Sequence, residues 1–553
     1  MGEEIRLFGP PGTGKTTRLA SHVRSTAKDR GTDRIVVGSF TRTAAAEIAG
    51  RGLPIPEYQI GTLHSLAYRA IDRPDVAVDK IDSWNAEHPD LKISGEMRSI
   101  DEANIESGTG TGLSGDALLG EIDLYRARLI PRSVWNTRAL TFDRLWTKWK
   151  HDHAVIDFTD MIEIAYQETE VAPGDPVVGF FDEFQDFTPL EIALVRKWGE
   201  RMDRLVIAGD DDQTLFSFKG ADPRAFLEPE IPDEHKRFLT QSYRVPRAVQ
   251  HLAQNWIEQL SSREPKDYEP RDEEGLVRYE PTFLFAQPGR LVADIVKQID
   301  ASRTVMLLTT CGYMLDSIRR DLRGAGVPFH NPYCRSRGDW NPLHSARGVT
   351  SAERLASYLI IDPDRFPDDY RQWIGADLKA WMSIVKSTGM LVRGAKRKIE
   401  MLEPTAPVPY DVLEALFVSP EVCADAVSAS PSWLNENLLS AKRSVMQYPL
   451  AIAKHRSGPE LVSTPKLIVG SVHSVKGGQA DVVYLLPDLS KAARRQFVKG
   501  SGIVKDSVIR QMYVGMTRAA EELVICGPST LDAINPLLMM MHAKPKGKSN
   551  GST

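Results

Sequence analysis

Cysteine is scarce in this chain, and the few that occur stand apart. Four of the 553 residues are cysteine, at Cys311, Cys334, Cys423 and Cys526. None lies in a C-x-x-C pair, so the spacing argues against zinc, iron–sulfur and disulfide frameworks. Isolated reduced thiols are typical of a cytoplasmic protein, and we expect that location.

Long apolar runs and an excess of positive charge are also lacking. No stretch approaches the ~20 residues of a membrane-spanning helix, and the start, Met1 to Glu4, lacks the basic and apolar segments of a secretory signal. We therefore expect no membrane association. A formal net charge of −5 excludes a basic coat, so any nucleic acid must bind in a local groove.

What the chain does have is enough length and apolar content for several cores. Its 553 residues, 42% of them hydrophobic and 26% charged, suggest a soluble protein of roughly three to four domains or subdomains. Apolar runs at 5–8, 34–39, 177–181 and 204–208 alternate with helical patterns, one of them at 43–49. This alternation predicts an α/β fold with a parallel sheet covered on both faces.

A second alternation of strand and helix patterns begins after Pro246. It has strand patterns at 304–309, 467–471 and 482–486 and a helical pattern at 314–324. Two segments interrupt these rhythms, at 71–151 and at about 331–460, and we interpret them as mainly helical insertions. The first insertion contains a Gly-rich segment at 108–115, which we expect to be a mobile loop.

A phosphate-binding pattern follows the first strand. It fits G-x-x-x-x-G-K-[ST] and consists of Gly9, Pro10, Pro11, Gly12, Thr13, Gly14, Lys15 and Thr16. Glycines let backbone N–H groups curve around phosphates, Lys15 supplies positive charge, and the Thr16 hydroxyl is a ligand for Mg²⁺. The order strand, loop, helix is the context this motif needs, so we predict an ATP site with bound Mg²⁺.

Two adjacent acids end the strand at 177–181. Asp182 is placed to hold Mg²⁺, and Glu183 to orient and deprotonate the attacking water. Phosphoryl transfer also needs positive charge near the γ phosphate, and Arg244 and Arg518 are the candidates. Taken alone, either arginine is more typical of a surface salt bridge than of a catalytic site. Neither belongs to the first α/β unit, so their arrival at ATP would make closure of a cleft depend on the nucleotide.

Ordered blocks along the chain resemble the superfamily 1A helicases, the UvrD/Rep/PcrA family. The segment 182–186 (DEFQD) and the segment 209–213 (GDDDQ) match family motifs unchanged. The remaining similar blocks are 40–47, 61–66, 155–161, 216–221, 239–246, 472–477 and 513–519.

The resemblance implies two RecA-like parallel-sheet motor domains, each with a helical insertion. On the family pattern, motor domain 1A covers 1–71 and 151–245, insertion 1B covers 72–150, motor domain 2A covers 246–335 and 461–540, and insertion 2B covers 336–460. We expect the tail 541–553, rich in Lys, Gly and Ser, to be disordered.

It also implies an enzyme, an ATP-dependent DNA helicase that moves 3′→5′ on single-stranded DNA. The expected partners are single-stranded DNA and single-strand–duplex junctions, with the protein a monomer or weak dimer. By position, Gln213 resembles the γ-phosphate sensor, Arg244 and Arg518 the two arginines that reach ATP, and Tyr243 the aromatic that stacks on the base. Gln479, Thr17 and Arg18 complete the predicted nucleotide-binding set.

Six further positions resemble the family's DNA track: Phe40, Thr62, His64, Phe216, Phe218 and His473. Aromatic rings stack on any base, which suits a stepping motor. Core packing is the competing interpretation for Phe216 and Phe218, and a structural role is the competing one for the two histidines.

Some positions depart from the family pattern. The P-loop begins at Gly9, without room for the usual adenine-reading segment, so we expect relaxed nucleotide selectivity. Phe218 replaces the family's Trp, Lys219 its Arg, and Gln479 its ribose-binding Glu. Two other functions stay open: a translocase that displaces proteins from DNA with little unwinding, and an AAA+-like ATPase that remodels proteins. A nuclease domain after Arg518 is not expected.

Overall fold

The computed structural model forms two compact units joined at several points of the chain. Unit 1 comprises Met1–Leu284, Met306–Tyr313 and Gly470–Thr553, and unit 2 comprises Phe285–Val305 and Met314–Val469. The structure describes residues 2–40, 45, 50, 52–94, 114–333, 340–345, 348–359 and 372–541. The predicted Gly-rich loop lies mainly outside these residues, as do the predicted helix at 43–49, except Ala45, and most of the tail. The finer division into four parts remains a prediction.

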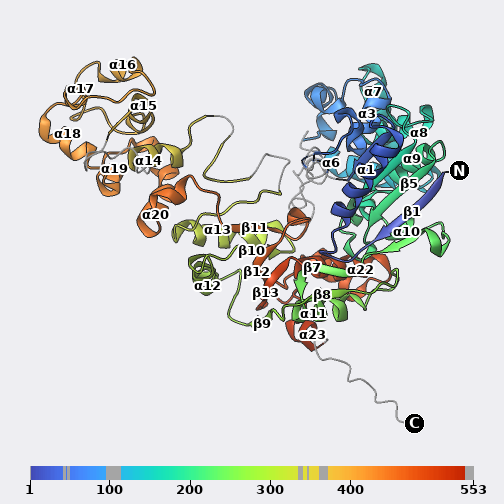
Figure 1. Ribbon diagram of the computed structural model, residues 1–553. Helices are drawn as coiled ribbons and strands as arrows, with labels where there is room; N and C mark the ends of the chain where they lie inside the picture. The colour runs from blue at the N-terminus through green and yellow to red at the C-terminus, as the bar shows by residue number, and fades with distance from the viewer. Residues whose placement is uncertain are drawn as a thin grey trace, which may run out of the picture. The chain divides into compact units, whose positions relative to one another are not determined.

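Unit 1 contains a six-stranded sheet in the order β3-β2-β4-β5-β1-β6. Figure 1 labels two of its strands, β1 and β5. Each neighbouring pair is parallel, as the α/β rhythm predicts. The strands are β1 (Glu3–Phe8), β2 (Ile35–Ser39), β3 (Ile60–Thr62), β4 (Val178–Asp182), β5 (Arg204–Gly209) and β6 (Lys236–Phe238).

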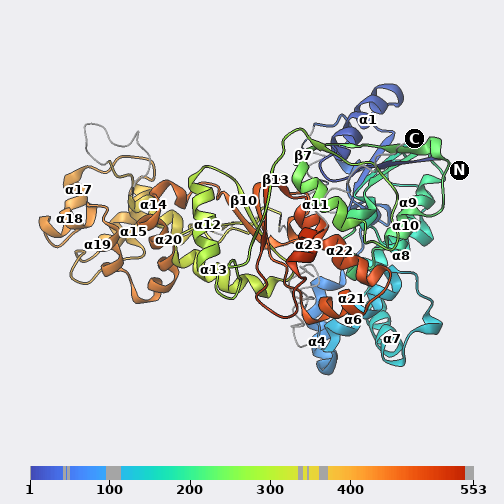
Figure 2. The ribbon, with the colours of Figure 1, turned by 90° about the horizontal axis from the view of Figure 1, so that it is seen from below.

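Helices cover both faces of this sheet because successive strand residues point to opposite sides. Phe180 packs with helix α1 (Lys15–Arg30) on one face, and its neighbour Phe181 packs in the core on the other face. That second face is covered by α3 (Leu63–Ala70), α8 (Phe158–Glu168) and α9 (Pro189–Gly199). Figure 2 shows α1 on one side of the strands and α8 and α9 on the other. The predicted two-sided α/β fold is confirmed.

The first insertion is helical, as predicted. Its elements are α4 (Ile81–Glu87), α6 (Ser114–Ala127) and α7 (Thr137–Asp152). Trp84, Trp135, Trp146 and Trp149 are all buried in its core, which explains why tryptophan is concentrated in this segment.

A second sheet has the order β11-β10-β12-β13-β9. The pairs β12–β13 and β13–β9 are parallel. Its strands are β9 (Leu276–Glu280), β10 (Val305–Thr309), β11 (Leu467–Ser471), β12 (Ala480–Leu485) and β13 (Ala519–Cys526). A short pair, β7 (Gln241–Pro246) with β8 (Glu269–Arg271), lies outside both sheets. The other helices of unit 1 are α10 (Pro223–Leu227), α11 (Arg247–Ile257), α21 (Lys491–Lys499), α22 (Ile503–Met516) and α23 (Pro536–Met541).

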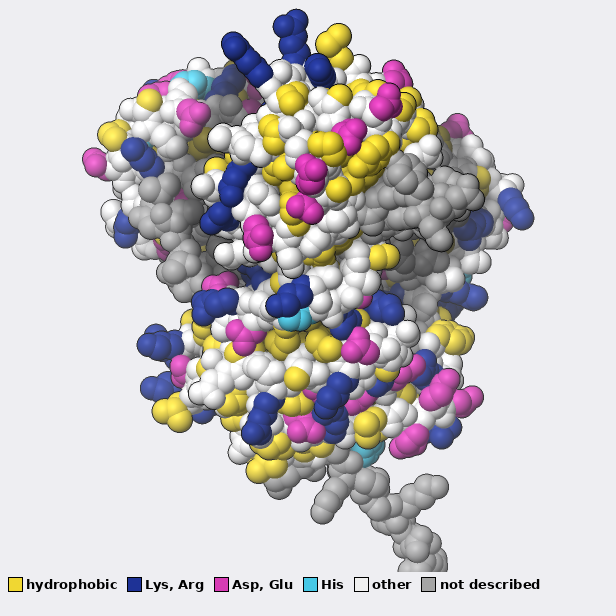
Figure 3. Space-filling model, turned by 90° about the vertical axis from the view of Figure 1, so that its left-hand side faces the viewer, with side chains coloured by type: hydrophobic (Ala, Val, Ile, Leu, Met, Phe, Trp, Pro, Cys, Tyr) yellow, Lys and Arg dark blue, Asp and Glu magenta, His cyan; other side chains and the backbone are white. Residues whose placement is uncertain are grey.

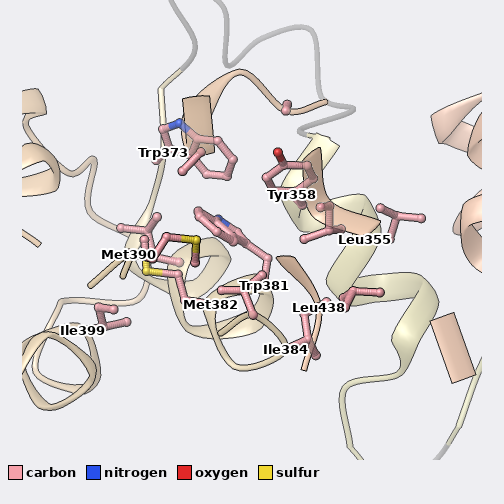
Figure 4. Close-up of a cluster of buried hydrophobic side chains, with 14 of the residues drawn as sticks. Leu355, Tyr358, Trp373, Trp381, Met382, Ile384, Met390, Ile399 and Leu438 are labelled. Carbon is pink, nitrogen blue, oxygen red and sulfur yellow. The ribbon is translucent and has the colours of Figure 1, made fainter. Parts of the chain in front are cut away.

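Unit 2 is mainly helical and has its own apolar core. Figure 4 shows Trp381 between Trp373 and Tyr358, with ring centroids 5.5 and 5.1 Å away. The helices are α12 (Gly289–Asp300), α13 (Leu315–Gly324), α14 (Ser351–Leu359), α15 (Gly375–Met382), α16 (Ala395–Glu400), α17 (Tyr410–Glu414), α18 (Pro420–Val427), α19 (Pro431–Asn437) and α20 (Arg443–His455).

The surface of unit 2 carries some of its apolar side chains. Figure 3 views the molecule from the side of α17 and α18, and hydrophobic side chains gather over the upper part of this face. Met401, Tyr410, Val412 and Val418 are exposed. Among the described residues, no helix combines the length and the apolarity needed to cross a bilayer.

The carboxyl ends of the parallel strands bring the motifs of unit 1 to one edge. Phe8, at the end of β1, is in register with Gly209 at the end of β5. Ser39, at the end of β2, is in register with Asp182 at the end of β4. The P-loop, the two acids and the segment 210–213 therefore leave the sheet side by side, at the edge where α/β proteins bind ligands.

Candidate active site

The P-loop joins β1 to α1 through two glycines in the left-handed region. Gly12 has φ 79° and Gly14 has φ 77°, conformations that favour glycine. A Cβ on Gly12 would also lie 2.6 Å from the Cβ of Arg244, so a side chain cannot fit there. Gly14 caps α1 without a side-chain hydrogen bond, which leaves N–H groups of the first turn for a phosphate.

Lys15 lies inside this loop. Its side chain is 8% exposed, and its Nζ donates to the Gly9 carbonyl at 2.5 Å. Burial lowers the pKa of Lys15, while the charges of Asp210 and Glu183 act in the opposite direction. An ammonium group with a backbone carbonyl as its hydrogen-bond acceptor is suited to bind a phosphate oxygen.

Thr16 and Asp182 form an oxygen pair next to Lys15. The Thr16 Oγ1 donates to Asp182 Oδ2 at 2.7 Å. Burial, followed by the charge of Glu183, raises the pKa of Asp182 to about 6. One hydroxyl beside one carboxylate fits Mg²⁺, which binds few protein oxygens and keeps water and phosphate as its other ligands. Within the described residues, no group of three or more His, Cys, Asp or Glu could form a separate metal centre.

Glu183 has a backbone conformation that is unusual for a residue other than glycine, with φ 54°. Such conformations cluster at functional sites. Burial alone would raise the pKa of Glu183, but the ammonium groups of Lys476 and Lys15 outweigh it and lower the pKa to about 2. Gln185 donates to Glu183 Oε2 at 2.6 Å. The carboxylate is therefore charged and held from two sides.

Lys476 is a site residue to which sequence reasoning gave no role. Its Nζ lies 3.0 Å from Glu183 Oε2, pairs with Asp186 and donates to the Gln213 carbonyl at 3.3 Å. Its position in the block 472–477, directly before Gly477, was the available signal. The lysine brings a charge from the second sheet to the acids of the first.

Strand β7 lies directly against the P-loop. The Tyr243 amide donates to the Gly12 carbonyl at 2.9 Å. The Ser242 hydroxyl and the Tyr268 phenol both donate to the Pro11 carbonyl, at 3.0 and 3.1 Å. The Tyr243 side chain remains 76% exposed, so its ring is free to stack on a base, as its predicted role requires. Sequence reasoning missed Ser242 and Tyr268 as P-loop partners.

The two predicted arginines both lie at this site. Arg244, beside Gly12, donates through Nε to Gln479 Oε1 at 2.8 Å, so two predicted nucleotide-binding residues are in contact. Arg518 is 2% exposed and donates through Nη2 to Gln213 Oε1 at 3.0 Å. The surface salt bridge considered for Arg518 is therefore wrong: its side chain is buried against Gln213.

Aromatic candidates for the DNA track cluster next to this network. Phe216 lies 4.8 Å from Phe40 and 6.0 Å from Phe218, between ring centroids. His473 lies 5.5 Å from Phe218. Phe216 and His473 are buried, whereas Phe40 and Phe218 are partly exposed. Only Phe40 and Phe218 can contact a base without a rearrangement. The DNA role of all four residues remains a prediction.

His473, Thr62 and His64 also have structural partners. Burial, followed by the Lys219 charge, lowers the pKa of His473 to about 3, so its ring is neutral near pH 7. The Thr62 side chain caps α3 by accepting from the Ser65 amide at 3.2 Å. The ring of His64 is 40% exposed and lies 3.5 Å from Glu191. A DNA contact is sterically open to His64.

Comparison with protein-family models matches residues 2–219 to the AAA domain. This range holds the six-stranded sheet up to β5, the P-loop, both acids and Gln213.

Curated relatives match over a wider range. A putative ATP-dependent DNA helicase YjcD of Bacillus subtilis is 25% identical over 293 residues, 48% of this chain and 38% of the relative. The ATP-dependent DNA helicase PcrA of Leuconostoc citreum is 23% identical over 47% of this chain and 38% of the relative. UvrD2 of Mycobacterium tuberculosis is 26% identical over 46% of this chain and 41% of the relative.

The chain thus spans about two fifths of the length of these relatives. The P-loop, the DEFQD acids and the GDDDQ segment lie at the ends of neighbouring strands, and over the matched range the chain is similar to the UvrD and PcrA helicases of superfamily 1A.

Proposed function

We propose that this protein is an ATP-dependent motor that translocates 3′→5′ on single-stranded DNA and couples ATP hydrolysis to duplex unwinding. The observation that carries the proposal is the contact between Arg518 and Gln213. It joins the segment after β5 to the segment before β13, so one nucleotide site is built from both sheets. The names of the relatives, ATP-dependent DNA helicases, support DNA as the track.

ATP binding follows from the P-loop and β7. The backbone N–H groups at 12–16 and the Lys15 ammonium group bind the β and γ phosphates. Thr16 and Asp182 would hold Mg²⁺, which would neutralise part of the phosphate charge. Tyr243 stacks on the base, and Gln479 binds the sugar.

Hydrolysis needs a base for water and positive charge for the phosphate. Glu183 orients the attacking water and accepts its proton. Arg244 and Arg518 stabilise the charge that spreads over the γ-phosphate oxygens during transfer. Because both arginines also contact Gln479 or Gln213, the presence of phosphate changes contacts on both sheets.

Coupling to DNA runs through the segment 213–218. Gln213 lies three residues before Phe216, and Lys476 connects the two: its Nζ donates to the Gln213 carbonyl and lies 5.8 Å from the Phe216 ring centroid. A shift at the phosphate end is therefore transmitted to the aromatic cluster. ATP drives this motion only through a difference in its affinity for the two conformations. We propose that the motor acts on single-strand–duplex junctions as a monomer or weak dimer.

ATP turnover measured with and without a single-stranded oligonucleotide tests the motor assignment. We expect strong stimulation by DNA. Turnover that does not respond to DNA would instead favour a protein-remodelling ATPase. Partial duplexes with a 3′ or a 5′ single-stranded tail test the direction, and we expect unwinding from the 3′ tail. A forked duplex with and without a bound blocking protein separates unwinding from protein displacement.

A further inference from the structure

Three consecutive carboxylates lie buried behind the nucleotide site, and their cations come from outside any motif considered above. Asp210, Asp211 and Asp212 each have 0% exposed side-chain area. Their partners are Arg263 and Lys266, in the loop between α11 and β8. All five residues belong to unit 1.

Lys266 lies at the centre of this group. Its Nζ is 3.2 Å from Asp210, 2.5 Å from Asp211 and 3.1 Å from Asp212, and its side chain is 1% exposed. Arg263 approaches Asp212 through two nitrogens, with Nε 2.9 Å from Oδ1. Buried carboxylates of like charge need such partners, because repulsion and lost hydration would otherwise displace or protonate them.

The first carboxylate also sets the orientation of Gln213. The amide nitrogen of Gln213 donates to Asp210 Oδ2 at 2.7 Å, and its amide oxygen accepts from Arg518 at 3.0 Å. A carboxylate only accepts and a guanidinium only donates, so this amide orientation is the one that satisfies both partners. Lys266 binds the other oxygen of Asp210. It therefore affects the orientation of Gln213 through Asp210.

Arg510 connects the same carboxylate turn to α22. Its Nε donates to the Asp211 carbonyl at 2.9 Å and its Nη2 to the Ser262 carbonyl at 3.3 Å. Helix α22 ends at Met516, two residues before Arg518. Both members of the Gln213–Arg518 contact are therefore anchored on the carboxylate turn and the loop that carries Lys266.

We propose that Lys266, assisted by Arg263, is a positioning residue for Gln213. By holding the Asp210 carboxyl group in place, it keeps the Gln213 amide oxygen directed at Arg518. This inference rests on the proposed ATPase, in which Gln213 responds to the γ phosphate. Lys266 itself touches neither ATP nor DNA in this scheme.

A double-mutant cycle between Lys266 and Gln213 tests the proposal. The variants are Lys266→Met, Gln213→Ala and the pair, assayed for ATP turnover with saturating oligo-dT. We expect Lys266→Met to lower kcat about 10-fold, the effect of one lost positioning hydrogen bond, and to change KM for ATP less than twofold. In the Gln213→Ala background it should lower kcat no further, because it acts through Gln213.

Two further variants separate positioning from folding. Lys236→Met removes a lysine that pairs with Asp233 and Glu264 and does not contact the three carboxylates; we expect an unchanged kcat. Lys266→Met with Asp211→Asn restores the charge balance of the buried group. This pair should melt near the wild-type temperature and still show the loss in kcat.

The outcomes distinguish failure of the Lys266 positioning role from failure of the proposed ATPase. Independent losses from Lys266→Met and Gln213→Ala, or full kcat in the charge-balanced pair, would overturn the positioning role and leave the ATPase proposal intact. Full activity in Gln213→Ala, with turnover insensitive to DNA in the parent protein, would overturn both.

Discussion

Two buried regions of this protein are built on opposite principles. The carboxyl edge of the first sheet buries Lys15, Asp182 and the carboxylates 210–212. The core of unit 2 buries Trp373, Trp381 and Tyr358, with aliphatic side chains around them. Both exclude water, yet one retains charge and the other is almost wholly apolar.

The difference separates what stabilises the fold from what performs the chemistry. Removing apolar area from water stabilises a core by roughly 25 cal/mol per Å². Burying charges opposes folding unless every charge is paired, and even then apolar residues are often as stable. The charges at the sheet edge are therefore explained by their chemistry, and the Trp381 core by its contribution to stability. Mutations in the two regions should affect different measurements.

The largest expected effect is the loss of ATP turnover in Lys15→Ala. The variant removes the ammonium group inside the P-loop, so we expect kcat to fall about 10³-fold or more and unwinding to disappear. Because burial disfavours the charged form of Lys15, its removal should affect thermal unfolding much less than it affects turnover. Near-normal DNA-stimulated turnover in a purified variant would contradict the site.

Trp381→Ala should show the opposite pattern. Removing a fully buried tryptophan leaves a cavity, and we expect unit 2 to lose about 3–5 kcal/mol of unfolding free energy. Urea unfolding monitored by tryptophan fluorescence measures this loss. At temperatures where the variant stays folded, ATP turnover without DNA should remain within about twofold of wild type. An equal loss of turnover would mean that the two regions are not separable.

Phe218→Ala tests, within unit 1, whether the aromatic cluster serves the chemistry or the packing. Phe218 is partly exposed in the aromatic cluster, where stacking on a base contributes about 1–3 kcal/mol. We expect slower translocation and weaker stimulation by DNA, with KM for ATP unchanged. A translocation rate equal to wild type would leave Phe218 as a packing residue.

The smallest expected effect tests whether a partly buried charge away from the nucleotide site, that of Asp123, opposes folding. Burial, followed by the charge of Asp157, raises the pKa of Asp123 from 3.8 to about 7. Stability linked to this carboxyl is full below about pH 4 and is lost as the pH rises through 7. Because the Asp123 side chain is 28% exposed, solvent screens much of this effect. Asp123→Asn should therefore raise the unfolding free energy by only about 1 kcal/mol at pH 8 and by much less at pH 4.

The control for that prediction is the hydrogen bond that Asp123 accepts from Thr159 at 2.9 Å. Asparagine can accept it through its own oxygen, so the substitution removes charge alone. Equal stabilities at pH 8 would show that the neighbouring Arg126 already compensates the carboxylate.

Sequence could predict the parts of the site that local patterns encode. The P-loop, the acids after β4 and the strands themselves follow from short-range rules, because a strand, a tight turn and a helix need particular residues at fixed spacing. Both arginines were also predicted, from a resemblance over many blocks.

The pairings across the chain could not be predicted. Lys476 and Asp186 are 290 positions apart, and Tyr268 and Pro11 are 257 apart. No local pattern connects such residues, since their contact depends on how two sheets are arranged. Lys266 stands in no recognised block, and only the folded chain brings three carboxylates around its ammonium group.

The two parts of the nucleotide site are synthesised at different times. Residues 9–213 contain the P-loop, both acids and Gln213, and they emerge from a ribosome about three hundred positions before Arg518. A growing chain can thus fold its phosphate loop long before the guanidinium that completes it exists. In the proposed ATPase, nascent protein should therefore bind nucleotide early and hydrolyse it only after β13 has joined the second sheet.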